Sequence, residues 1–72
     1  MQRQLPPNRL RELRNGRDLK LYDLAALLRV DPATIFRWEA GDTAIPDWAK
    51  LALAEFFKVE PTYLMGWDEV AA

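Results

Sequence analysis

The chain has 72 residues, half of them apolar, a formal net charge of −1, and neither cysteine nor histidine. A chain of this length folds as one domain with a small core, because it can bury only about 60% of its unfolded surface. Without cysteine and histidine there is no disulfide framework, no common zinc site and no usual general base. We therefore expect no metal or other cofactor, no catalysis and no small-molecule substrate.

The chain shows no segment for a membrane or for export. No apolar run approaches the roughly 20 residues of a membrane span, and no signal-peptide pattern follows Met1. We therefore expect a cytoplasmic protein without membrane contact.

The charges are divided unevenly between the two halves of the chain. Residues 1–37 carry eight basic and four acidic side chains, a net charge of +4, whereas residues 38–72 carry a net charge of −5. This asymmetry suggests one face turned to phosphate and another turned away, although ordinary surface charge can also produce it. The net acidity alone is not typical of a nucleic-acid-binding protein.

Apolar spacing and turn residues predict helices throughout, and no alternating strand pattern is present. Residues 1–7 form a flexible arm, since Pro6 and Pro7 oppose a helix there. The expected helices cover residues 8–14, 21–28, 32–40, 48–58 and 61–65. Residues 67–72 are expected to be a fraying tail.

Local capping chemistry marks the ends of these helices. Asn8 is expected to cap the first helix and Asp47 the fourth, since both side chains accept hydrogen bonds from free N–H groups. Asp31 and Pro32 open the third helix, and Gly41 suits the left-handed residue that closes it. Gly66 closes the fifth helix in the same way.

The segment from Leu24 to Gly41 is the most informative part of the chain. Leu24 and Leu28 share one helical face, and Ile35 and Trp38 share a face of the next helix. Two short helices joined by so tight a corner are typical of a helix-turn-helix, whose second helix enters the major groove of DNA.

With these motifs the chain resembles the Cro/C1-type helix-turn-helix family of phage repressors, Cro proteins, antitoxins and related regulators. The resemblance spans residues 9–66. It is carried by RLRELR at 9–14, LA at 24–25, Val30, TIFRWEAG at 34–41, Pro46 and VEPTYLMG at 59–66.

The resemblance implies an all-α, five-helix, lambda-repressor-like domain over residues 8–66, with the helix-turn-helix at about residues 21–40. It implies a core built around Leu10, Leu13, Leu24, Leu28, Ile35, Trp38, Leu51 and Phe57. It also implies an ion pair between Arg14 and Glu39, which would give Arg14 a structural role.

The chain departs from the family's operator readers in three places. Leu21 stands where they usually have a glutamine that grips a phosphate. The outward positions of the second helix of the motif, which are usually polar, are Pro32, Ala33, Phe36 and Arg37. The following loop lacks the usual lysine or arginine and instead contains Asp42.

Candidate DNA contacts follow from the residues that remain. Arg37 has no carboxylate one helical turn away and is the best candidate to read a base, as guanine O6 and N7 suit a guanidinium. Its neighbours Pro32, Ala33 and Phe36 suit either thymine methyl groups or a protein. The candidate phosphate contacts are Arg9, Arg17, Lys20 and Arg29.

Two groups of apolar residues are candidates for a protein interface. Trp48, Ala52 and Phe56 recur every four residues beside the expected inner face of their helix. Large aromatic residues outside the core favour an interface, although a small domain can also use them as a wide edge of its core. The second group is Tyr63, Met65 and Trp67 near the C-terminus.

These observations lead to two hypotheses. The first is a small phage or prophage transcriptional regulator that acts in a genetic switch by binding double-stranded operator DNA as a homodimer. The second is an antirepressor or modulator, or an antitoxin-like protein, that binds a partner repressor protein instead of reading DNA. The first is the leading hypothesis, and the second is motivated by the apolar outer face of the second motif helix, the acidic loop after it and the net acidity of the chain.

Overall fold

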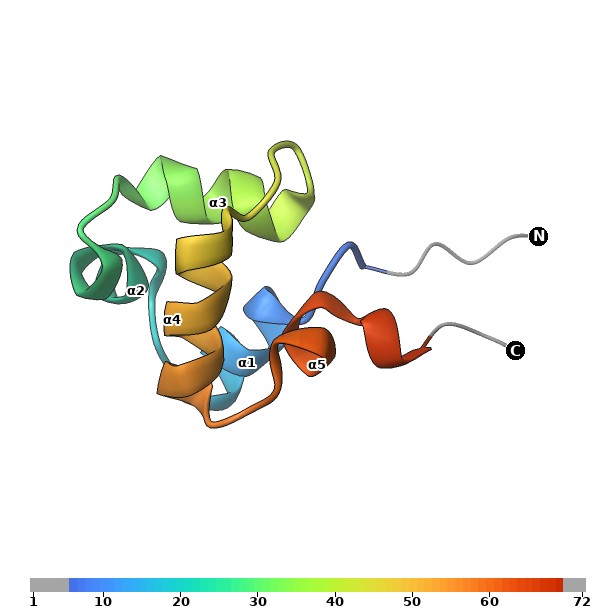
Figure 1. Ribbon diagram of the computed structural model, residues 1–72. Coiled ribbons are helices and arrows are strands. Elements are labelled where there is room, and N and C mark those ends of the chain that lie inside the picture. Colours follow the sequence, from blue (N-terminus) through green and yellow to red (C-terminus); the bar gives the residue numbers. More distant parts are fainter. Residues whose placement is uncertain (1–5, 70–72) are drawn as a thin grey trace.

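The computed structural model describes residues 6–69, with the side chain of Glu69 left aside, and it is helical without strands over this range (Figure 1). This confirms the all-α, five-helix prediction. The elements are α1 (Leu10–Gly16), α2 (Leu21–Leu28), α3 (Pro32–Ala40), α4 (Asp47–Phe57), α5 (Pro61–Met65) and a final 3-10 turn, η1 (Trp67–Glu69).

The corner between α2 and α3 forms through the local chemistry that its sequence predicts. α2 ends at Arg29, which adopts a left-handed conformation with φ of 60°. Asp31 then caps α3, because its Oδ1 accepts a hydrogen bond of 2.8 Å from the Ala33 N–H. Pro32 occupies the first turn and Gly41 closes the helix with φ of 81°. The helix-turn-helix is therefore present at the expected position.

The core lies where α1, α2, α3, α4 and α5 meet, and each contributes one large side chain that is fully buried. These are Leu10, Leu24, Ile35, Leu53 and Leu64. Trp38 of α3 packs edge-on against Trp48, with ring centroids 6.2 Å apart, so the start of α4 lies against α3. In Figure 1, α4 then runs away from α3 toward the side on which α1 lies.

The expected inner face of α4 was partly wrong. Phe57 is buried as predicted and Ala54 is buried too, but Leu51, which was expected in the core, is 63% exposed. The helix instead buries Ala49 and Leu53, together with Ile45 from the preceding loop. The small Ala49 side chain allows the start of α4 to approach the core closely, and this fixes the rotation of the helix.

Other predicted boundaries need smaller corrections. Asp47 was expected to cap α4, but it is the first helical residue, makes no capping bond, and lies 3.5 Å from Lys50 Nζ. The first helix continues past Arg14 to Gly16. Asn8 does accept a hydrogen bond of 3.0 Å from the Leu10 N–H, at the start of that helix.

The two ends of the chain are only partly described. A fraying tail was expected from residue 67 onward. Residues 67–69 instead form a 3-10 turn directly after the left-handed Gly66. The predictions for residues 1–5 and 70–72 lie outside the described residues.

The rotation of α4 can be tested by truncating its two leucines. We expect Leu53→Ala to lower the free energy of unfolding by about 2–5 kcal/mol, because it leaves a cavity at a fully buried site. Leu51→Ala should change it by less than about 0.5 kcal/mol, as for an ordinary surface substitution. Chemical denaturation followed by circular dichroism measures both. Equal losses would contradict the assigned inner face.

Candidate nucleic-acid interface

A buried carboxylate joins α1 to α3 on the side of α3 that faces the core. The side chain of Glu39 is only 1% exposed. Its Oε2 lies 2.6 Å from Arg14 Nε, and its Oε1 accepts hydrogen bonds from Arg14 Nη2 at 3.1 Å and from Arg11 Nε at 3.2 Å. We call Glu39, Arg14 and Arg11 the Glu39 cluster.

All three guanidinium nitrogens of Arg14 donate hydrogen bonds within the domain. Its Nη1 also donates a hydrogen bond of 2.8 Å to the Leu19 carbonyl, which fixes the segment between α1 and α2. The hydrogen bond to Glu39 raises the pKa of the Arg14 guanidinium by more than burial lowers it, and the negative charge of Glu39 raises it a little further. Arg14 and Glu39 thus form the pair that the family resemblance implies.

The four residues predicted for the outer face of α3 are all exposed: Pro32, Ala33, Phe36 and Arg37. They share one side of the helix because Ile35, Trp38 and Glu39 are buried on the other. The ring of Phe36 is half exposed. Within residues 6–69, the guanidinium of Arg37 has no ion pair or hydrogen bond, so it is available to a ligand. This is the surface that a helix-turn-helix presents to the major groove.

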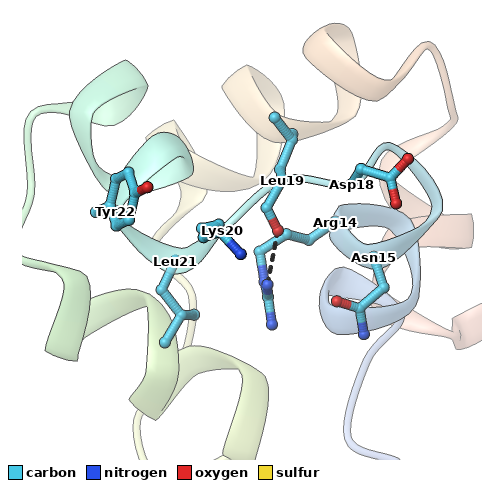
Figure 2. A pocket seen from close by; sticks show the side chains of 7 residues that line it. All are labelled: Arg14, Asn15, Asp18, Leu19, Lys20, Leu21 and Tyr22. Carbon is cyan, nitrogen blue, oxygen red and sulfur yellow. Dashed lines mark hydrogen bonds between the residues drawn. The ribbon is translucent and has the colours of Figure 1, made fainter.

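A shallow cleft of about 580 Å³ separates the end of α1 from the start of α2 (Figure 2). Its lining consists of Arg14, Asn15, Asp18, Leu19, Lys20, Leu21 and Tyr22. In Figure 2 the dashed line marks the hydrogen bond between the Arg14 guanidinium and the Leu19 carbonyl, two groups of this lining. Leu21 is half-buried and packs against the core. The family's phosphate-gripping position is therefore used for packing in this chain.

Two of the four predicted phosphate contacts lie at the ends of α2. Lys20 immediately precedes α2 and Arg29 follows it, and both are exposed. Over the described range neither side chain takes part in an ion pair. The helix itself is fixed at its start by Asp23 Oδ2, which accepts a hydrogen bond of 2.8 Å from the Lys20 backbone N–H.

Arg9 does not suit the predicted role of a phosphate contact. Its side chain is only 11% exposed, and its Nη1 lies 2.8 Å from both the Tyr63 carbonyl and Asp68 Oδ1. Its guanidinium also lies 3.9 Å from the centre of the Tyr63 ring. Arg9 therefore fastens the start of α1 to α5 and η1.

Arg17 is likewise displaced from the predicted surface. Its Nη1 donates a hydrogen bond of 3.2 Å to the Phe56 carbonyl, at the C-terminal end of α4, and its guanidinium lies 5.2 Å from the Phe56 and Phe57 ring centres. A cation at this end of a helix is favourable. An 11-residue helix is about 16 Å long. The length of α4 thus separates Arg17 from α3.

The residues predicted for a protein interface have different surroundings. Trp48 is 53% exposed, whereas Ala52 and Phe56 are half-buried. Leu27 and Leu51 are also exposed, and sequence reasoning missed both as surface residues. Leu27 belongs to a groove of about 290 Å³ between α2 and α4, lined by Leu27, Leu28, Ala52, Glu55 and Phe56. We call Leu27, Trp48, Leu51 and Ala52 the α4 surface.

The C-terminal group is less uniform. Tyr63 is half-buried beneath the Arg9 guanidinium, and Met65 packs against the core. Trp67 is exposed, and Lys50 Nζ lies 5.1 Å from its ring centre. Of this group, Trp67 offers the largest free apolar surface.

The comparison with protein families decides what this architecture is. A family model described as helix-turn-helix, of the Cro/C1 type, matches residues 10–64, which include α1 to α4 and all of α5 except its last residue. The chain belongs to the Cro/C1-type helix-turn-helix family. No curated protein and no solved structure matches the chain. Membership identifies this helix-turn-helix domain as a DNA-binding transcription regulator.

The described residues contain neither a membrane-spanning helix nor a cluster of metal ligands. None of the helices described has the length and apolar character needed to cross a bilayer. In the part of the chain that the structure describes, no three acidic side chains gather closely enough to hold a metal ion.

The Glu39 cluster predicts unequal effects for its two arginines. Arg14→Met should lower the free energy of unfolding by about 3–5 kcal/mol, because it removes the main partner of a buried carboxylate. Arg11→Met should cost less than about 1 kcal/mol, since the Arg11 side chain is 54% exposed. Urea unfolding compares them, and Arg14→Lys should give an intermediate value. Similar values for Arg14→Met and Arg11→Met would contradict the asymmetry.

Proposed function

We propose that this chain is a phage or prophage transcriptional regulator that acts in a genetic switch by binding operator DNA. α3 enters the major groove, Arg37 contacts a base edge, and Lys20 and Arg29 contact phosphates on either side. The observation that carries the proposal is the exposed, unpaired Arg37 on the outer face of the second helix of the motif.

The electrostatics of the surface support this orientation. Arg29 lies at the corner between α2 and α3, Arg37 lies in the last turn of α3, and Lys20 stands at the start of the first motif helix. The exposed Asp42 after α3 and the acidic C-terminal half favour an orientation in which they lie away from the backbone phosphates. With so few phosphate contacts per protomer, a dimer on two half-sites would supply the affinity that one protomer lacks.

The proposal predicts that Arg37 and Arg17 have different importance for DNA binding. Arg37→Gln should weaken binding to a duplex selected from a randomised library by about 5-fold to 100-fold. This is the loss of affinity expected when one bidentate contact to guanine is removed. Arg17→Gln removes the same charge at the far end of α4 and should change the affinity much less. Fluorescence anisotropy at one fixed salt concentration measures both. Equal losses would indicate unspecific charge attraction and contradict the assigned reading face.

A second candidate function is an antirepressor or modulator that binds a partner repressor. The α4 surface favours it, because Leu27, Trp48 and Leu51 expose a large apolar area on a small domain. Exposed apolar patches mark interaction sites, and tryptophan, here Trp48, is enriched among the energetically important residues of protein interfaces. The same surface would equally serve the homodimer of the first proposal.

The two functions differ in what α4 must contact. If the chain is an antirepressor, it should co-elute in size-exclusion chromatography with a repressor encoded beside it, and Leu51→Glu should abolish the co-elution. Lys58→Glu, at the end of α4, is the control and should leave it intact. Two separate peaks for the unsubstituted chain and the repressor would refute this second function.

A further inference from the structure

The start of α3 has no free backbone donor to offer to DNA. Pro32 has no N–H. The Ala33 N–H donates to Asp31 Oδ1 at 2.8 Å, and the Thr34 N–H donates to the Asp31 carbonyl at 2.8 Å. The Asp31 carboxylate also opposes the positive end of the helix dipole. This end of α3 is therefore closed as a site for phosphate.

The side chains on the outer face of α3 also lack hydrogen-bonding groups over about one turn. Pro32, Ala33 and Phe36 present only carbon and hydrogen, and all three are exposed. Half of the Phe36 ring is in contact with water, although a core lies directly behind the helix. Polar base edges would lose hydrogen bonds to water against such a surface without gaining new ones.

The major groove offers one apolar group, the C5 methyl of thymine. A surface of Pro32, Ala33 and Phe36 complements this group and no other feature of the base edges. Arg37 follows Ala33 by four residues, or about 6 Å along the helix axis, which corresponds to about two base-pair steps. Its guanidinium complements guanine O6 and N7 at that distance.

We propose that this chain selects a half-site in which the methyl group of a thymine contacts Ala33 about two base pairs from a guanine that contacts Arg37, and that Phe36, the residue before Arg37, contacts a second thymine methyl group closer to that guanine. This specificity rests on the proposed function of operator binding. It names the base chemistry that the outer face of α3 takes.

Replacing thymine by deoxyuridine tests the proposal directly, because it removes the methyl group and keeps every hydrogen-bonding atom. The full chain is first used to select a duplex from a randomised library. The same duplex is then made with deoxyuridine at the half-site thymines. We expect the affinity to fall about fourfold for each methyl group that is buried.

Two variants connect the loss to this face. Phe36→Ala should weaken binding to the thymine duplex and should remove most of the difference between thymine and deoxyuridine. Thr62→Ala removes a methyl group from an exposed position of α5, outside the outer face of α3 and the α4 surface, and should keep the full difference. Circular dichroism verifies that both variants are folded, as expected for exposed positions.

The possible failures are distinguishable. If a sequence is enriched but binds equally well with deoxyuridine, the thymine specificity is wrong and operator binding stands. If no sequence is enriched over the starting library, operator binding itself is wrong, and the thymine specificity falls with it.

Discussion

The buried Glu39 carboxylate determines how α3 is presented to its surroundings. Its contacts with Arg14 and Arg11 hold α3 against α1, while Asn8 Nδ2 donates a hydrogen bond of 2.9 Å to the Trp38 carbonyl nearby. These contacts fix the rotation of α3 about its own axis. A carboxylate with almost no exposure cannot turn outward without losing all of its charged partners. The face that carries Arg37 is therefore set by interactions on the opposite side of the helix.

The helix-turn-helix could be predicted because its determinants are local. Asp31 caps its own helix two residues on, and Gly41 supplies the left-handed conformation at the end. Such interactions join residues that are close together in the sequence, so the sequence predicts them. The rotation of α4 could not be predicted in this way, because apolar residues occur on nearly all sides of this helix. There the contacts of Ala49 and Ile45 with the core decide between two faces that periodicity leaves equivalent.

The candidate site shows the same division between local and distant determinants. Lys20, Arg29 and Arg37 belong to the motif or adjoin it, and their exposure follows from their positions in it. Arg9 contacts Tyr63 and Arg17 contacts Phe56, and each partner is 39 or more residues away in the sequence. A count of basic residues contains no information about such partners. It therefore overestimated the positive surface available for DNA.

The raised pKa of Arg14 has a consequence for the conditions under which the domain works. The stability that this group contributes is present at every pH below its unfolded pKa and is lost only as the pH rises through the still higher folded value. The sequence contains no histidine, the side chain that ordinarily titrates near neutrality. Arg14 thus keeps its charge when the pH of a cell changes by one unit around neutrality. Deprotonation of Arg14 is therefore not a means by which the contact between α1 and α3 could be released in a cell.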